Sequence, residues 1–212
     1  MRKRIQHYLR KLYNTILRLR LKNRDFSLIA SNCNGGCILH DLGLPFNSPF
    51  VNLWMKPKDF LRFCANMDEY LTKDFIFVTE EGISYPIGIL GGDVRIYFQH
   101  YRSSAEAVEA WNRRVKRINR DNLFLLETDR DGWTEEDFSA FEALPYENKV
   151  IFCHEERPDF RSAVYIPGFE DQREVGLCMN FTAPNSFKKF YDAFDYVSWF
   201  NRGRPARREK KG

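Results

Sequence analysis

Short apolar runs alternate with helix-forming segments along most of the chain, and this alternation is what most restricts the fold. The runs are FSLIAS (26–31), FIFV (75–78), NLFLLET (122–128) and KVIFCH (149–154). Runs of this length, bounded by polar or turn residues, are typical of strands that are buried on both faces of a parallel sheet. Because helical periods lie between them, the pattern predicts an α/β fold, with helices covering both faces of a layered, mixed and mainly parallel sheet.

Local signals add the helix starts and one turn. The predicted helices are KPKDFLRFCANMDEYL (56–71), SSAEAVEAWNRRVKRI (103–118), TEEDFSAFEAL (134–144) and NSFKKFYDAFDYVSWF (185–200). Ser103 and Glu106 have the spacing of a capping box, and Thr134 is a good cap for the third helix. Gly91 and Gly92 lie between two apolar runs, which predicts a tight hairpin.

The charge is distributed unevenly. Residues 1–24 carry nine Lys or Arg and no acid, residues 202–212 carry six basic residues against Glu209, and the whole chain is at +4, which leaves about −10 for residues 25–201. We therefore predict a basic amphipathic helix over 1–24, a single α/β domain over 25–201 and a basic disordered tail over 202–212. The acidic body and the absence of a nucleic-acid-binding motif predict that the protein does not bind nucleic acid.

The N-terminal segment has an apolar stripe at helical spacing. Its members are Ile5, Leu9, Leu12, Ile16 and Leu19, and they stand among arginines and lysines. Two interpretations remain open: the helix lies on an anionic membrane surface, or it packs this stripe on the body and exposes its basic face to solvent. The five cysteines are scattered and follow no secretory signal, so we expect a cytoplasmic protein, peripheral on the inner face of the cell membrane if the first interpretation holds.

Polar residues with catalytic chemistry follow several of the apolar runs. They are Cys33 after the first run, His100 after VRIYFQ, Asp129 after NLFLLET and His154 at the end of KVIFC. Ligands of open α/β sheets bind beyond the carboxyl ends of the strands, where parallel strands would bring such residues together. The set predicts a Cys-His-Asp nucleophilic site in which His100 or His154 is the base.

Cys33 stands where a strand meets a glycine-rich turn and a helix. The helix dipole would favour its thiolate, and the backbone around Gly35 and Gly36 would form an oxyanion hole, with Ser31 and Asn32 as further substrate contacts. The simpler interpretation is that the glycines only permit a tight turn and that Cys33 is a small buried residue.

A second chemistry is open in the same region. Asp129-x-Asp131 has the spacing with which sugar-nucleotide transferases hold a divalent ion, although such a short motif is also common in plain turns. Arg113 and Arg117 could bind phosphates of a donor, or they could simply complement the end of their helix. The nucleophilic interpretation requires neither a metal nor a cofactor, and an acyl donor such as acetyl-CoA would serve it.

Several longer stretches point to one family. SNCNGG, HDLGLPFNSPFVNLW, YPIG, FQHYRSSAEAVEAWNRRVKRINRDNLF, TDRDGWTEED and LPYENKVIFCHE follow one another in order within residues 26–178. In these motifs the chain resembles a domain-of-unknown-function family found in bacterial capsule and exopolysaccharide biosynthesis clusters, whose members are sometimes labelled acetyltransferases.

The resemblance implies a protein of surface-polysaccharide assembly that acts on a sugar or a lipid-linked saccharide. Combined with Cys33, it favours a sugar-modifying acyltransferase with a cysteine nucleophile. Two alternatives stay open, a metal-dependent glycosyltransferase that uses Asp129 and Asp131, and a non-catalytic partner that holds biosynthetic enzymes at the membrane.

Overall fold

A computed structural model describes residues 2–203, so the tail predicted over 202–212 lies almost entirely outside the described residues. Four parallel strands form the central sheet in the order β1-β5-β6-β7. They are β1 (Ser27–Ala30), β5 (Leu123–Thr128), β6 (Lys149–Cys153) and β7 (Ala163–Tyr165). The first three carry the apolar runs predicted for a parallel sheet, and nearly all of their residues are buried.

A separate antiparallel sheet corrects the predicted single, mainly parallel sheet. It contains β2 (Phe75–Val78), β3 (Ile87–Leu90) and β4 (Val94–Tyr97) in chain order. The run FIFV therefore does not join the parallel sheet, because short connections to β3 and β4 permit only antiparallel neighbours. Gly91 and Gly92 form the predicted hairpin between β3 and β4 with φ values of +64° and +94°.

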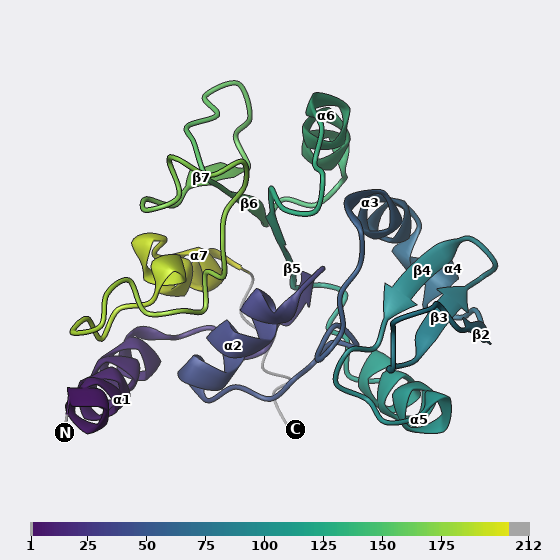
Figure 1. The fold of residues 1–212 in the computed structure, drawn as a ribbon, viewed down its shortest axis with the longest axis horizontal. Helices are drawn as coiled ribbons and strands as arrows, with labels where there is room; N and C mark the ends of the chain where they lie inside the picture. The colour runs from purple at the N-terminus through teal and green to yellow at the C-terminus, as the bar shows by residue number, and fades with distance from the viewer. Residues whose placement is uncertain (1, 204–212) are drawn as a thin grey trace, which may run out of the picture.

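Alternate residues of the parallel strands face two different cores. Leu28, Phe124 and Phe152 face α1 (Arg2–Arg20), α2 (Cys33–Leu42) and α7 (Tyr196–Arg202). Ile29 and Leu125 face α3 (Pro57–Ala65), α6 (Glu135–Ala143) and the antiparallel sheet with α5 (Ser104–Val115). Helices thus cover both faces of the central sheet, as predicted, and Figure 1 shows α1, α2 and α7 on one side of it and α3 and α6 on the other.

The predicted helices form with shorter bounds. Asn66 has a non-helical conformation (φ −133°, ψ 39°) and separates α3 from α4 (Met67–Tyr70). Ser103 caps α5 and Thr134 caps α6, both as predicted. The aromatic helix expected over 185–200 is reduced to a 3₁₀ turn, η1 (Phe190–Ala193), and α7, because Asp195 accepts a hydrogen bond from the Ser198 amide and starts the last helix there.

An extended segment around Trp54 and Met55 joins the two sheets. The amide of Met55 donates to the carbonyl of Ser31 at 2.9 Å, directly after β1, and Trp54 exchanges two 2.9 Å backbone hydrogen bonds with Tyr97 at the end of β4. The carboxyl ends of β1 and β4 are therefore held close together although the strands belong to different sheets.

No helix within residues 2–203 is long and apolar enough to span a bilayer. The predicted N-terminal helix is present as α1, and it lies at the edge of the molecule beside α2 (Figure 1).

Candidate active site

Cys33 is the first residue of α2, directly beyond the end of β1. Asn32 caps this helix, because its Oδ1 accepts a hydrogen bond from the Asn34 amide at 3.1 Å. The Nδ2 of Asn32 donates to Thr128 Oγ1 at 3.0 Å, which ties the turn to the end of β5. The thiol is therefore fixed at the carboxyl edge of the parallel sheet, as predicted.

The two glycines of the turn have different roles. A Cβ on Gly35 would lie 2.7 Å from the Cβ of Ala30, so glycine is needed there for α2 to pack closely on β1. Gly36 has no heavy atom within 4 Å of an added Cβ, and it lines a hollow beside Cys33. Gly35 thus serves packing, and only Gly36 has the open surroundings that a substrate-binding residue needs.

His100 is the residue that the structure brings to Cys33. Its Nε2 lies 3.8 Å from the Cys33 sulfur, which is within reach of a hydrogen bond to sulfur. The amide of His100 donates to the carbonyl of Asn52 at 3.4 Å, in the same connecting segment that binds both Ser31 and Tyr97. His100 therefore reaches the site from the antiparallel sheet and not, as expected, from a parallel strand.

Burial raises the pKa of the Cys33 thiol above its ordinary value. Partial burial disfavours the charged form and so opposes the stabilisation of the thiolate that we expect from the helix dipole. A thiol in this state needs a base to become a nucleophile. The imidazole of His100 is placed to take its proton.

Asp129 and His154 form a second pair, and neither residue lines the two described hollows at Cys33. Asp129 Oδ2 lies 2.5 Å from His154 Nδ1 and accepts from the His154 amide at 2.9 Å, while Oδ1 accepts from the Val175 amide at 2.7 Å. Both carboxylate oxygens are thus engaged, and Asp129 is only 6% exposed. The four predicted catalytic residues form two separate pairs, Cys33 with His100 and Asp129 with His154.

The two carboxylates of the Asp129-x-Asp131 motif differ in their surroundings. Asp131 lines the hollow beside Cys33 and adopts a φ of +64° in the turn after β5. Asp129 is not among the residues that line it. Because the carboxylate of Asp129 is engaged by His154 and Val175, it is not free to hold a divalent ion jointly with Asp131, as binding of a diphosphate through this motif would require.

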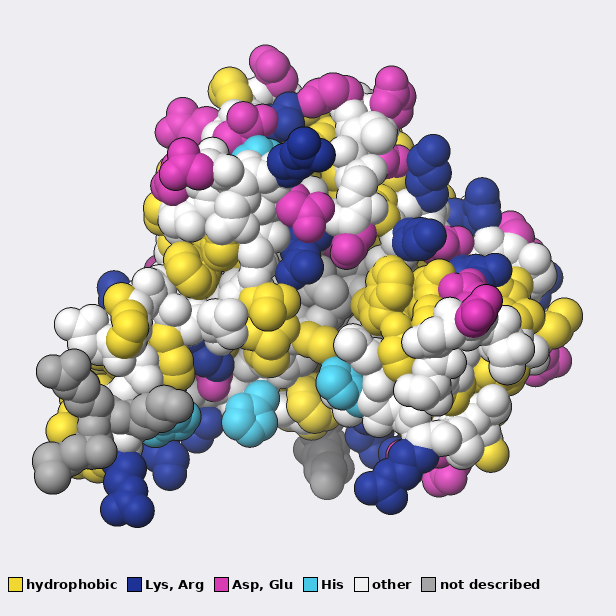
Figure 2. Space-filling view, in the orientation of Figure 1, with side chains coloured by type: hydrophobic (Ala, Val, Ile, Leu, Met, Phe, Trp, Pro, Cys, Tyr) yellow, Lys and Arg dark blue, Asp and Glu magenta, His cyan; other side chains and the backbone are white. Residues whose placement is uncertain are grey.

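Two hollows meet at Cys33. Both are lined by Cys33, Asn32 and Met179. One, of about 350 Å³, is lined by Trp54, Tyr85, Gln99, Arg130 and Asp131 among others. The second, of about 340 Å³, is lined by His100, His40, Phe46 and Lys189 among others. Figure 2 shows histidine side chains (cyan) lying among apolar ones (yellow) on this face of the molecule. Cys33 stands between two spaces that could hold two reactants.

Sequence reasoning missed much of the first hollow. Gln99 precedes His100 and Arg130 follows Asp129 in the sequence. Their position after a strand could therefore have indicated them as site residues. Trp54 and Tyr85 stand in connecting segments without a periodic pattern. Their contact, Trp54 Nε1 donating to Tyr85 Oη at 3.4 Å, joins residues that are distant in sequence.

The remaining predicted substrate residues lie elsewhere. Ser31 is 3% exposed, and its hydroxyl donates a hydrogen bond to the carboxyl group of Glu127. It therefore stabilises the turn and does not line the two described hollows at Cys33. Arg113 pairs with Glu109 on α5 at 3.3 Å, and neither Arg113 nor Arg117 lines the two hollows that the described residues form at Cys33. Of this predicted set, Asn32 and Gly36 line the site.

Comparison with known proteins places the chain in a family. The model of the domain of unknown function DUF1919 matches residues 4–201. The chain belongs to this family. The DUF1919 protein is also 52% identical to an uncharacterized protein of Haemophilus influenzae over 188 residues, which is 89% of this chain and 90% of the relative. The membership confirms the resemblance to a family of unknown function, and its connection with capsule or exopolysaccharide clusters stays a prediction.

Proposed function

We propose that this DUF1919 protein is an acyltransferase of bacterial surface-polysaccharide biosynthesis, with Cys33 as nucleophile and His100 as general base. The observation that carries the proposal is the 3.8 Å approach of His100 Nε2 to the Cys33 sulfur where two open hollows meet. A thiol, a base within reach and space for a reactant are the requirements of nucleophilic acyl transfer.

The first half-reaction forms a thioester on Cys33. The sulfur attacks the carbonyl carbon of the acyl donor, its proton passes to His100 Nε2, and the carbonyl electrons move to oxygen. When this oxyanion collapses, the bond to the leaving group breaks, and the leaving group takes the proton from His100. With acetyl-CoA as donor, the leaving group is the thiol of coenzyme A.

The second half-reaction returns the enzyme to its starting state. His100 takes the proton of an acceptor hydroxyl while the hydroxyl oxygen attacks the thioester carbon. The carbon–sulfur bond then breaks, and the sulfur of Cys33 recovers a proton from His100. The acyl group has moved from donor to acceptor without any oxidant or reductant.

The first hollow supports a saccharide as the acceptor. Trp54 stacks on Tyr97 with ring centroids 3.9 Å apart, and it lines the hollow together with Tyr85. Aromatic faces next to amide and charged groups, here Gln99 and Arg130, suit the apolar faces and hydroxyls of a sugar. The acceptor would be a free sugar or a lipid-linked saccharide at the inner face of the cell membrane.

Thiol labelling tests the proposal, and Cys37 is its matched reference. Both Cys33 and Cys37 are half-buried, and burial raises the pKa of both thiols, but only Cys33 has a histidine in contact. We expect iodoacetamide to modify Cys33 about tenfold faster than Cys37 at neutral pH, because His100 takes the proton during attack. Peptide mass spectrometry of timed samples gives both rates.

Two histidine variants serve as the test and its control. His100→Ala should reduce the Cys33 rate to that of Cys37, whereas His40→Ala, which removes another exposed histidine of the same hollow, should leave it unchanged. Equal rates for the two cysteines, or no effect of His100→Ala, would contradict the dyad. Slow labelling of Cys64, Cys153 and Cys178 carries no weight because all three are fully buried.

A further inference from the structure

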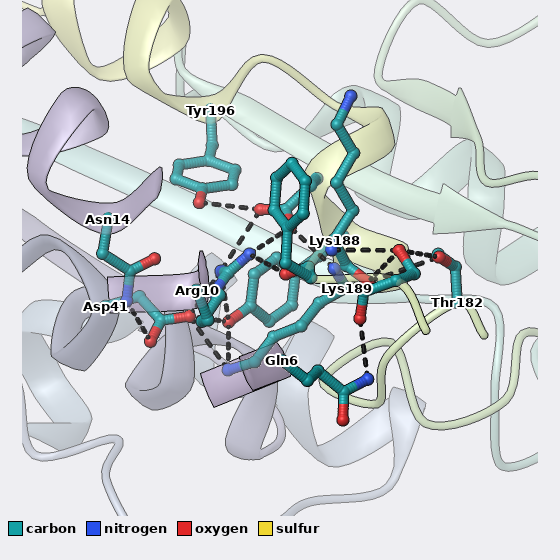
Figure 3. A network of polar contacts seen from close by, with 12 residues as sticks. Gln6, Arg10, Asn14, Asp41, Thr182, Lys188, Lys189 and Tyr196 are labelled. Atoms are coloured by element: carbon teal, nitrogen blue, oxygen red, sulfur yellow. Dashed lines mark hydrogen bonds and ion pairs between the residues drawn. The ribbon is translucent and has the colours of Figure 1, made fainter. Parts of the chain in front are cut away.

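Helix α1 packs on the body through a polar face. Gln6, Arg10 and Asn14 are each less than 9% exposed, and they stand one helical turn apart. Figure 3 shows Arg10 lying between Asp41 of α2 and the segment that contains Lys188 and Lys189. Arg10 Nη2 donates to Asp41 Oδ2 at 2.6 Å and Nη1 pairs with Asp192, while Asn14 Nδ2 donates to Asp41 Oδ1 at 2.9 Å. Leu17 and Leu21 complete this inner face.

The apolar stripe of α1 therefore points outward. Leu19 is 81% exposed, and Ile5, Leu12 and Ile16 are about half exposed. Tyr8 extends the stripe with 62% exposure. Of the two interpretations left open by the sequence, packing of this stripe on the body is wrong, although the helix itself does pack there through its other face. A helix that buries its polar face and exposes its apolar one presents a contiguous apolar surface, which is typical of an interaction site.

The charges that α1 itself carries beside the stripe are all positive. Residues 1–24 contain no acid, and the exposed Arg4, Lys11 and Lys22 border the stripe or continue beyond it. Arg20, on an exposed flank of the helix, pairs with Asp195 at 2.7 Å. Apolar side chains beside Lys and Arg on one helix complement a surface that is apolar inside and anionic outside.

We infer that α1 docks the protein on an anionic lipid surface, lying flat with the stripe in the acyl-chain boundary and its cations toward the headgroups. The acidic body, at about −10 for residues 25–201, would be repelled by the same surface and would leave α1 as the contact. A hollow of about 380 Å³ between Ile5, Leu9 and Pro184 extends the apolar surface onto the neighbouring loop.

A second copy of the chain fits this face less well. A two-fold contact through the stripe would bring the basic residues beside it, such as Arg4 and Lys11, near basic residues of α1 in the other copy, with no acid of α1 to separate them. Like charges brought together in this way oppose association. A lipid headgroup supplies the opposite charge.

Vesicle co-sedimentation of the full-length protein tests the inference. We expect the protein to pellet with vesicles of phosphatidylcholine and phosphatidylglycerol, and to bind at least tenfold more weakly at high salt or to pure phosphatidylcholine. The double variant Leu12→Glu, Ile16→Glu should lose binding by a similar factor without unfolding, since both side chains are exposed. Ile76→Glu, which alters an equally exposed residue on β2, is the matched control and should bind like the parent.

Each other outcome would overturn the inference. Failure of the full-length protein to pellet at low salt would exclude lipid docking, and equal binding to neutral vesicles would exclude an anionic surface. Sedimentation equilibrium that shows a dimer lost in the Leu12→Glu, Ile16→Glu variant would assign the face to a second copy. Cys33→Ser should bind vesicles like the parent, because docking through α1 does not rest on the proposed chemistry.

Discussion

Replacing Arg10 by alanine is expected to lower the free energy of unfolding by about 3–5 kcal/mol, because it removes the cation that pairs with buried Asp192 and leaves Asp41 with Lys189 alone. The side chains of Arg10, Asp41 and Asp192 are all no more than 6% exposed. Burial alone would raise the pKa of Asp41, but hydrogen bonds from Tyr191, Lys189 and Arg10 outweigh it and hold the pKa at about 2. Urea denaturation of the parent and of Arg10→Ala at pH 7 measures the difference.

An exposed ion pair on the same helix gives the control. Arg20 pairs with Asp195 at 2.7 Å with both side chains about half exposed, so Arg20→Ala should cost no more than about 1 kcal/mol. A loss from Arg10→Ala as small as that from Arg20→Ala would contradict the buried network. Since the folded pKa of Asp41 is lowered, its contribution should be present above about pH 4 and be lost as the pH falls toward 2.

The second large effect is expected at Glu127. This residue is 2% exposed on β5, and burial raises the pKa of its carboxyl group to about 8. One oxygen accepts hydrogen bonds from Ser31 and from the Thr128 amide, while Oε2 is buried without a partner in the described structure. The folded protein therefore favours the protonated acid.

The sign of the pH dependence follows from this raised pKa. Between about pH 4.5 and pH 8 the folded state holds a proton that the unfolded state has lost, so stability falls as the pH rises through this range. The loss of stability is on the order of 5 kcal/mol at most. Glu127→Gln, which resembles the protonated acid, should abolish this fall and unfold at higher urea than the parent at pH 9. Glu81→Gln, at an exposed position, should keep the parent's slope, and a flat profile for the parent would contradict the assignment.

The sequence predicts the parallel strands well because their signal is local. β1, β5 and β6 are continuous apolar runs, and runs of this kind are buried on both faces of a sheet. FIFV is equally apolar but belongs to the antiparallel sheet, because its partner is set by the connections to β3 and not by its own composition.

The orientation of α1 could not be predicted from its own residues. The spacing from Ile5 to Leu19 indicates an apolar face but does not say which way that face points. The direction is decided by Asp41 and Asp192, which lie far along the chain and bind Arg10. A charged residue in a helix can thus determine which face is buried when its partners come from other elements.

The candidate site was half predictable for a similar reason. Position after a strand indicated that Cys33 and His100 would lie close together, and they are 3.8 Å apart, although His100 is held there by a backbone hydrogen bond to Asn52 in the segment before Trp54. The same rule placed Asp129 and His154 in the site, but the Val175 amide and the His154 ring engage the Asp129 carboxylate, and neither residue lines the two described hollows at Cys33. Strand ends identify an edge of a sheet, and loop contacts decide which side chains share a hollow there.

Trapping of an acyl-enzyme tests the central claim most directly. The protein is incubated with acetyl-CoA or p-nitrophenyl acetate without any saccharide, quenched in acid, and analysed by intact-protein and peptide mass spectrometry. We predict one acetyl group on Cys33 in the parent and none at position 33 in Cys33→Ser. In His100→Ala the acetylation of Cys33 should be strongly reduced, because the thiol then lacks its base. Absence of acetylation at Cys33, or equal acetylation of Cys33 and Cys37, would contradict the account.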